Sequence, residues 1–388
     1  MFDNFIGDKR PLSWAFQFWP VLVLSFVFAF VATWLCKKIA LKLGIVDKPD
    51  NKVKTHKEPI AYLGGIGIFT GLAVGILTGI FCLLGQNYLD GTLKWLLGIL
   101  AGAAIACIVG VIDDVFDLNP KKKFLGEILT ALPLIIVGIM PALVYPADYS
   151  GSNISRSVEW ILAVSIVFFF VLGSTNSLNL LDGLDGLCAG VTAIIAFAQL
   201  LLAVHISTWA SSDAGNAVRI IICLGLLGSV CGFLPFNRHP AKIFMGDGGS
   251  VMLGFTTAAI MILFAENTLR WWMASIVIFA LPILDTATAL ARRILNKRPL
   301  FVSDRGHIYD QMIDRGIPLN KTVNICYALS AVYGLIGVTF SLAGTIYALI
   351  AYLVVFAVSG IVIWRTGFLK MEGLRGAHRK MVRPSEKN

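Results

Sequence analysis

The chain has 388 residues, of which 57% are hydrophobic and 14% are charged, and its formal net charge is +9. Soluble domains carry roughly 25% charged residues, so a soluble protein of this composition would lack the polar surface that water requires. The composition therefore excludes an ordinary soluble enzyme and indicates a chain solvated mainly by lipid, whose helices satisfy their own backbone hydrogen bonds. The positive charge requires no nucleic-acid partner, because membrane topology accounts for most of it.

Windows of about 20 apolar residues predict membrane spans. They predict an all-α, polytopic transmembrane helical bundle of about eleven spans (10–11), of which the eighth is the shortest. The first window follows Lys9 and Arg10 but lacks an obvious small-residue cleavage site, so we expect an uncleaved span rather than a signal peptide. The expected spans cover residues 14–36, 62–84, 94–112, 125–142, 159–178, 187–206, 217–234, 250–265, 271–291, 322–343 and 345–366.

The basic residues predict the orientation of these spans. With eleven spans, one set of loops and the C-terminal tail hold 26 of the 32 Lys and Arg residues. Loops rich in Lys and Arg lie on the cytoplasmic side, which puts the N-terminus outside and the C-terminus in the cytoplasm of a cell inner (plasma) membrane. We expect a single integral membrane domain over residues 1–388, ending in a basic cytoplasmic tail at 367–388.

The seven cysteines are scattered, odd in number and without a C-x-x-C pair. Most of them fall in apolar spans, where cysteine behaves as a small hydrophobic residue. The cysteine pattern therefore indicates neither a disulfide framework nor a zinc site.

Acidic residues gather on the predicted cytoplasmic side, at the ends of several spans. They are Asp113, Asp114, Asp182, Asp185 and Asp247, and Asp285 lies two turns before the end of the ninth span. Acidic side chains close to lipid are expensive and mark functional sites. A proton-coupled transporter would more typically place them near the bilayer midplane, whereas a cluster at the interface suits a site open to a water-soluble substrate.

The first acidic motif is VIDDVFDLNPKKKF, in which Asp113 and Asp114 end a span and three lysines follow. A simple solvated loop would explain this composition equally well. In the functional interpretation, the paired carboxylates hold Mg²⁺ or accept a proton, and the lysines Lys121–Lys123 attract phosphate. Mg²⁺ favours a few carboxylates plus phosphate oxygens over a full protein cage.

The second motif is GSTNSLNLLDGLDGL, where Asn176, Asn179 and Asp182 recur every three residues. This spacing puts the three polar side chains on one face of a helix, which Gly183 and Gly186 then end. A helix C-cap explains one Asn and one Gly, but it does not explain three polar side chains inside an apolar span.

The third motif, PFNRHPAKIFMGDGGS, places glycines on both sides of Asp247 just before a span. A glycine turn that runs into a helix N-terminus presents backbone N–H groups to an anion, although an ordinary capped turn has the same composition. The GGIG run at residues 64–67 opens an apolar span instead of following a strand, so it is no dinucleotide-binding fingerprint. Close helix packing explains it.

The fourth motif lies in the longest predicted cytoplasmic loop, residues 292–321, where Arg305 and His307 stand between Asp304 and Asp310. Topology alone makes such loops basic, but a histidine among these charges favours a functional loop. The remaining histidines are isolated in the sequence, and His205 is interpreted as a structural residue; they are His56, His205, His239 and His378.

In these segments the chain resembles the polyprenyl-phosphate N-acetylhexosamine-1-phosphate transferases, also called glycosyltransferase family 4. The resemblance covers about residues 46–315, the motif-bearing core, and none of its motifs falls in the last two spans. It rests on five segments in the family's order, which are VDKPDNKVKTHKEPIAYLGG, DDVFDLNPKKKFLGE, NSLNLLDGLDGL, FMGDGGS and DRGHI.

This resemblance implies an enzyme with ten or eleven transmembrane helices and a cytoplasmic site. It implies Mg²⁺ as cofactor, with Mn²⁺ as a substitute, and it implies a UDP-sugar, a polyprenyl phosphate and the membrane as partners. The products would be UMP and a pyrophosphate-linked lipid. A homodimer is left open.

The resemblance also assigns roles to individual residues. Asp113 and Asp114 match the essential acidic pair, one of them proposed as a base, and Asp247 and Asn179 match the metal-contacting positions. Asp247 counts among the catalytic residues as well. The expected substrate-binding residues are His56, Lys57, Lys121, Asn176, Asp182, Asp185, Arg305 and His307.

One departure from the family pattern bears on the sugar. Relatives often carry further histidines in the fifth motif, and the phospho-N-acetylmuramoyl-pentapeptide transferase branch has a triplet, but here the sequence reads His307-Ile308-Tyr309. The departure favours UDP-N-acetylglucosamine, at the start of a lipid-linked cell-envelope glycan such as an O-antigen of lipopolysaccharide, a teichoic-acid-like polymer or an exopolysaccharide. The alternatives are the pentapeptide transferase, a lipid or solute transporter, and a scaffold without activity.

Overall fold

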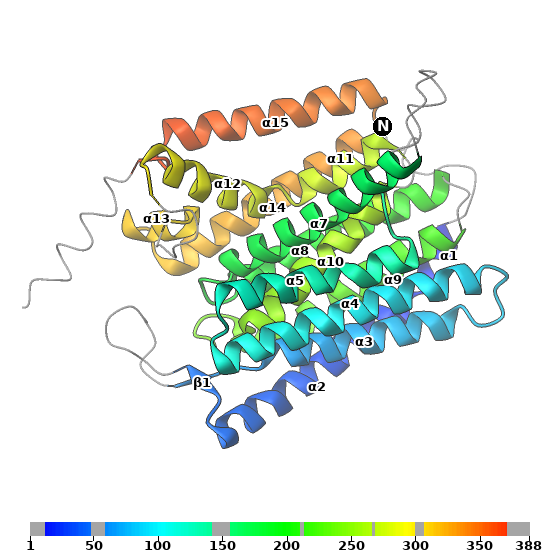
Figure 1. Cartoon of the computed structure of the whole chain (residues 1–388), viewed down its shortest axis with the longest axis horizontal. Helices are drawn as coiled ribbons and strands as arrows, with labels where there is room; N and C mark the ends of the chain where they lie inside the picture. Colours follow the sequence, from blue (N-terminus) through cyan, green and yellow to red (C-terminus); the bar gives the residue numbers. More distant parts are fainter. Residues whose placement is uncertain are drawn as a thin grey trace, which may run out of the picture.

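The computed structural model describes residues 12–47, 59–141, 156–209, 213–265, 268–298 and 306–370, and this part of the chain is mostly helical. The helices run side by side in one bundle (Figure 1). In chain order they are α1 (Leu12–Phe16), α2 (Trp19–Leu43), α3 (Gly64–Cys82), α4 (Leu89–Phe116), α5 (Pro120–Val137), α7 (Arg156–Leu181), α8 (Leu187–Trp209), α9 (Asp213–Asn237), α10 (Gly246–Phe264), α11 (Leu269–Ile278), α12 (Ala280–Leu295), α13 (Ile308–Asp314), α14 (Leu319–Ser341) and α15 (Thr345–Arg365).

The helical, membrane-embedded character expected from the sequence is confirmed. Within the described residues, nine helices are long and apolar enough to cross a membrane, or ten if a bent pair counts as one span. Large apolar side chains are exposed along α2 and α15, as expected of surfaces that face lipid. The protein is therefore a multi-pass membrane protein. Its span count and its orientation stay predictions.

The predicted fourth span, residues 125–142, overlaps α5, which is not among these nine helices. Its first turns contain three lysines and Glu127, and charged residues lower the hydropathy of so short a helix. The predicted ninth span is the bent pair, in which α11 and α12 meet at 68°. Pro282 lies in the first turn of α12, where it has no N–H for the carbonyl of Ile278 and thereby prevents α11 from continuing straight.

Helix α10 forms the centre of the bundle. It packs against α4, α7 and α3, and every residue in it is buried except Asp247 in its first turn. The peripheral helix α15, by contrast, buries only Ala348 and Tyr352. The single partly exposed residue of α10 thus lies at its N-terminal end.

Glycines let the central helices approach closely, as expected for the GGIG run. A Cβ on Gly65 of α3 would overlap the backbone of Gly248 and Gly249 in α10. The backbone N–H groups of Gly64 and Gly65 also donate to the carbonyls of Phe244 and Met245, at 3.0 and 2.9 Å. The start of α3 and the start of α10 are therefore joined directly.

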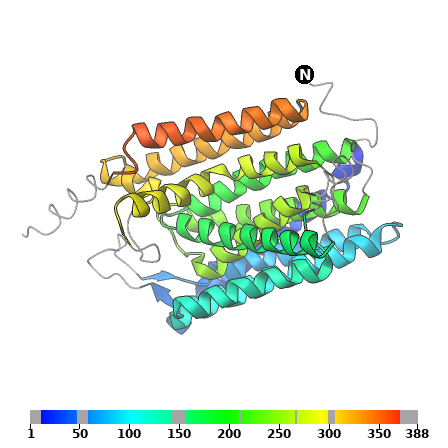
Figure 2. The same ribbon diagram turned by 45° about the horizontal axis from the view of Figure 1, so that its top comes forward.

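The sequence did not predict a small antiparallel sheet, in which β1 (Val46–Asp47) pairs with β2 (Ile60–Ala61). Phe244, just before α10, donates its N–H to the carbonyl of Ala61 at 2.9 Å. The sheet, the α4–α5 turn and α13 lie at the same end of the bundle (Figure 2). The motif-bearing turns are thus gathered at one end.

Candidate active site

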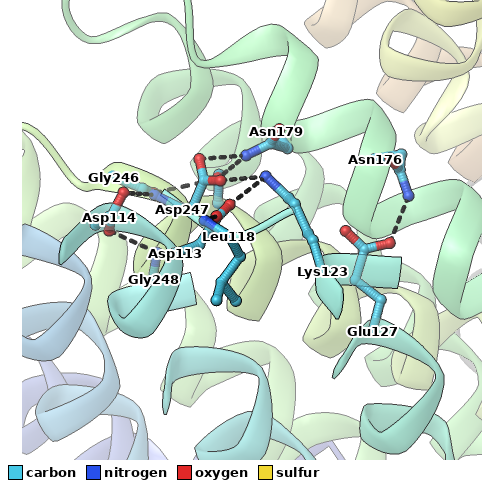
Figure 3. Close-up of polar contacts among 11 residues, drawn as sticks. Asp113, Asp114, Leu118, Lys123, Glu127, Asn176, Asn179, Gly246, Asp247 and Gly248 are labelled. Carbon is cyan, nitrogen blue, oxygen red and sulfur yellow. Dashed lines mark hydrogen bonds and ion pairs between the residues drawn. The ribbon is translucent and has the colours of Figure 1, made fainter. Parts of the chain in front are cut away.

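Asp114 binds the N-terminus of the central helix. Its Oδ1 accepts the backbone N–H of Asp247 at 2.8 Å and its Oδ2 accepts that of Gly248 at 3.1 Å (Figure 3). The first N–H groups of a helix have no partner within the helix, and the positive end of the helix dipole favours a carboxylate there. Asp114 therefore fixes α10 to the end of α4.

Two glycines make this contact sterically possible. A Cβ on Gly110, one turn before Asp114 in α4, would overlap the backbone of Asp247 and Gly248. Gly246 has a φ of +66°, and a Cβ there would collide with the Asp114 carboxylate. Gly110 was not among the residues expected to matter from the sequence, although a glycine one helical turn before an acidic pair is a usable signal of close packing.

The other member of the acidic pair, Asp113, faces a lysine. The Nζ of Lys123 lies 2.8 Å from Oδ2 of Asp113 and also contacts the carboxylate of Asp247 (Figure 3). Oδ1 of Asp113 accepts the backbone N–H of Leu118 at 2.8 Å. Asp113, Lys123 and Asp247, from α4, α5 and α10, form what we call the acidic cluster.

The turn between α4 and α5 brings Lys123 back to this cluster. The side chain of Asn119 caps α5 by accepting the backbone N–H of Lys121 at 3.0 Å, and Pro120 occupies the first helical position. Lys121 is exposed on this helix, whereas Lys123 is partly buried. Of the three lysines, the structure thus brings Lys123 and not Lys121 into the cluster.

Asn179 completes the contacts around Asp247. Its Nδ2 donates to Oδ1 of Asp247 at 2.7 Å and to Oγ of Ser250 at 3.0 Å (Figure 3). One turn earlier in α7, Asn176 instead donates to Oε2 of Glu127 at 2.8 Å. The two asparagines come from the same helix, but only Asn179 reaches the cluster.

Asp182 and Asp185 follow α7 in what we call the Asp182 loop, residues 182–186. Burial raises the pKa of the Asp182 carboxyl well above its usual range, and the nearby carboxylates of Asp247 and Asp114 raise it further. Oδ2 of Asp185 lies 2.7 Å from Nδ1 of His239 and accepts the N–H of Ala241 at 3.1 Å. His239, interpreted as isolated in the sequence, therefore links this loop to the segment before α10.

His307 is paired with a buried acid. Its Nδ1 lies 2.7 Å from Oδ2 of Asp285 in α12, and the N–H of Ile308 donates to Oδ1 of the same carboxylate at 2.6 Å. His307 is 4% exposed and Asp285 is 1% exposed. The sequence had placed His307 among Asp304, Arg305 and Asp310, and it gave no signal that Asp285 is its partner.

Three expected substrate contacts, His56, Lys57 and Arg305, lie outside the described residues.

The donor chemistry at Asp247 fits a hard cation. The carboxylates of Asp113 and Asp247 converge on one ammonium group, so the two can share a cation, and Asn179 lies beside them. No group of three His, Cys, Asp or Glu side chains in the described ranges could hold a metal by itself. This suits Mg²⁺, which is often held by one or two carboxylates together with substrate phosphates.

Comparisons with known proteins agree with this arrangement of motifs. The model of the family described as glycosyl transferase family 4 matches residues 96–265, a stretch that contains Asp113, Asp114, Asn179 and Asp247. The chain is 31% identical over 318 residues to the probable undecaprenyl-phosphate N-acetylglucosaminyl 1-phosphate transferase of Bacillus subtilis, with 81% of this chain and 82% of that relative covered.

Two further relatives differ in the substrates that their names give. The decaprenyl-phosphate N-acetylglucosaminephosphotransferase of Mycobacterium tuberculosis is 28% identical over 316 residues, covering 78% of this chain and 77% of its own. The phospho-N-acetylmuramoyl-pentapeptide-transferase of Bacillus cereus is 32% identical over 230 residues, covering 57% of this chain and 66% of its own. The similarity to the N-acetylglucosamine enzymes thus extends over more of the chain.

Proposed function

This chain belongs to glycosyl transferase family 4, and we propose that it transfers N-acetylglucosamine 1-phosphate from UDP-N-acetylglucosamine to a polyprenyl phosphate, with release of UMP. The relatives that match most of its length are named as polyprenyl-phosphate N-acetylglucosamine phosphotransferases. The observation that carries the proposal is the acidic cluster at the N-terminus of α10, where two carboxylates and one lysine meet beside Asn179.

In this reaction, bonds form and break at a phosphorus atom of the nucleotide sugar. An oxygen of the lipid phosphate attacks the sugar-bearing phosphorus of the UDP-sugar, and the bond from that phosphorus to the bridging oxygen breaks. UMP leaves with this oxygen and its electron pair, and a pyrophosphate now joins lipid and sugar. Because both reactants are anionic, catalysis depends on in-line positioning and on neutralising charge. Lys123 supplies a positive charge at the point where Asp113 and Asp247 meet.

The contacts support different roles for the two adjacent acids. Asp114 uses both carboxylate oxygens to hold backbone N–H groups of α10, so we assign it to positioning. Asp113 faces Lys123 instead, and we assign to it the handling of charge or of a proton near the attacking phosphate. A lipid phosphate is largely ionised near neutral pH, so Asp113 has little need to act as a strong base.

We propose Mg²⁺ as the cofactor, with Mn²⁺ as a substitute, held by Asp247 and Asn179 with Asp113 close by. The metal would neutralise negative charge on the phosphate oxygens. Asn179 orients the Asp247 carboxylate through its hydrogen bond to Oδ1, and its second hydrogen bond, to Ser250, fixes the amide itself. These contacts hold the carboxylate in place before substrate arrives.

We further propose that the motif-bearing end faces the cytoplasm of a plasma (inner) membrane. The excess of basic residues in the loops at this end supports that orientation. A polyprenyl chain must lie in the bilayer while a nucleotide sugar arrives from water. A site at the end of the helix bundle gives both substrates access to the same carboxylates.

A second candidate substrate is UDP-N-acetylmuramoyl-pentapeptide, since one relative bears that name. The single His307 and the shorter match to this relative favour the smaller sugar. The test measures kcat/KM for both nucleotide sugars with purified protein, Mg²⁺ and a short polyprenyl phosphate, following UMP release. A higher kcat/KM for UDP-N-acetylglucosamine supports the proposal. A higher value for the pentapeptide substrate would move the chain to the other branch.

A further inference from the structure

The Asp182 loop is anchored at both ends by tyrosine side chains. Two residues before its start, the hydroxyl of Tyr309 donates to the carbonyl of Leu180 at 2.7 Å. At its end, the hydroxyl of Tyr327 donates to the carbonyl of Gly186 at 2.6 Å. Leu180 lies in the last turn of α7, where helix carbonyls lack partners within the helix. The two tyrosines come from α13 and α14, far along the chain from this loop.

Tyr309 is fitted closely against the loop. It is 4% exposed, and a Cβ on Gly183 would overlap its ring and hydroxyl. The Tyr309 ring also stacks on His307 with a centroid distance of 5.6 Å and an interplanar angle of 9°. Tyr309 thus contacts both His307 and Gly183, so a shift of His307 would be transmitted to the loop.

Asp285 holds His307 in this position. One of its carboxylate oxygens pairs with Nδ1 of His307 and the other accepts the N–H of Ile308. A carboxylate this deeply buried is costly unless its oxygens are hydrogen-bonded. Both of these contacts go to the two residues that precede Tyr309, so the buried acid fixes the turn into α13.

From this chain of contacts we propose that Asp285 is a positioning residue that acts through His307 and Tyr309. It holds the Asp182 loop in the conformation that binds the nucleotide sugar. The inference rests on the proposed function for its substrate. It also gives His307 an indirect role, because the His307 ring is used to join Asp285 to Tyr309. Loss of this link allows the loop to move while Asp113, Lys123 and Asp247 stay in place.

The test compares Tyr309→Phe with Tyr352→Phe. Tyr352 is a matched control, since its buried hydroxyl also donates to a backbone carbonyl, that of Gly337 at 3.0 Å, but between α15 and α14. Losing one hydrogen bond of this kind is expected to raise the KM for UDP-N-acetylglucosamine about fivefold to tenfold in Tyr309→Phe. The KM for the lipid and the kcat should change less than about twofold. Tyr352→Phe should leave all three constants unchanged.

Hydrogen exchange of the backbone at residues 180–190 supplies a second measurement that needs no turnover. Exchange there should be at least about tenfold faster in Tyr309→Phe and in Asp285→Asn than in Tyr352→Phe. Equal exchange in Tyr309→Phe and Tyr352→Phe, or an equal KM for the nucleotide sugar, would overturn the inference. If the unaltered protein did not transfer the sugar phosphate at all, the proposed function would fail, while the exchange measurement would still decide whether the loop is held in this way.

Discussion

The backbone N–H of Asp247 donates to the side chain of Asp114 at 2.8 Å, although the two residues lie 133 positions apart in the chain. This contact couples the end of α4 to the start of α10 and presents the Asp247 side chain next to Lys123 and Asn179. The two adjacent acids therefore have different contacts. Asp114 holds the N-terminus of α10, and Asp113 belongs to the acidic cluster.

We expect Asp113→Asn and Asp114→Asn each to lower turnover at least about 10²-fold, in the lower range for proton transfer or charge positioning. The two variants should differ in stability. Asp114→Asn replaces a carboxylate at a helix N-terminus, which costs about 0.3–2 kcal/mol when partly buried, so it should lower the Tm of the detergent-solubilised protein. Asp113→Asn should leave the Tm nearly unchanged. Near-normal turnover in both variants would contradict a catalytic role for the pair and leave it with structural contacts alone.

Removal of the divalent cation should abolish turnover, and Asp247→Ala should do the same in the presence of Mg²⁺. The reason is that Asp247 is the one residue of α10 that is not buried and that its carboxylate joins Lys123 and Asn179. Turnover is measured before and after EDTA, and again after Mg²⁺ or Mn²⁺ is restored. Unchanged turnover in EDTA would contradict the metal proposal but would leave the family assignment unchanged.

Gly110→Ala should disturb the site although the residue carries no functional group. A methyl group there would press on the backbone of Asp247 and Gly248, and overpacking of this kind costs about 1–3 kcal/mol. We expect a lower Tm together with a loss of activity of about tenfold or more, the equivalent of 1.4 kcal/mol in a barrier.

Gly173→Ala is the matched control for this change. Gly173 also lies in a helix, α7, but its added Cβ would meet nothing within 4 Å. It should leave activity unchanged and the Tm equal or slightly higher, because alanine favours helices over glycine. Equal effects of the two substitutions would show that the close approach at Gly110 is not needed.

The orientation can be tested with single cysteines on a background in which all seven native cysteines are replaced. An impermeant thiol reagent applied to intact cells should label a cysteine at Asn87, in the exposed α3–α4 turn, but not one at Lys370, which follows α15. The distribution of Lys and Arg is the physical reason. Labelling at Lys370 and not at Asn87 would invert the predicted topology and place the motif-bearing end outside.

The helices were predictable because most other backbone conformations would leave N–H and C=O groups without hydrogen bonds in lipid. Each expected span overlaps a helix or the bent pair, since long apolar segments can hide their backbone from lipid only by forming helices. The bend at Phe279–Ala280 and the short sheet near the first loop were not foreseen. Both depend on where neighbouring helices pack, and hydropathy contains no information about that.

The composition of the site was predictable, but the pairing within it was not. Asn179 and Asp247 meet as expected, whereas the lysine named from the sequence was Lys121 and the lysine that reaches Asp247 is Lys123. Successive residues on a helix point in directions about 100° apart, so only the packing of α5 selects Lys123. The pairs Asp285–His307 and Asp185–His239 join separate segments, and their distance in the chain hides them from motif analysis.

The fate of the β-phosphate of the nucleotide sugar tests the central claim most directly. Purified protein is given polyprenyl phosphate, Mg²⁺ and UDP-N-acetylglucosamine that carries a radiolabel on the phosphate next to the sugar. Transfer of sugar 1-phosphate predicts that the label moves into the lipid fraction and that unlabelled UMP is released in equal amount, in a manner that depends on Asp247. Release of labelled UDP, with the sugar alone on the lipid, would contradict the account.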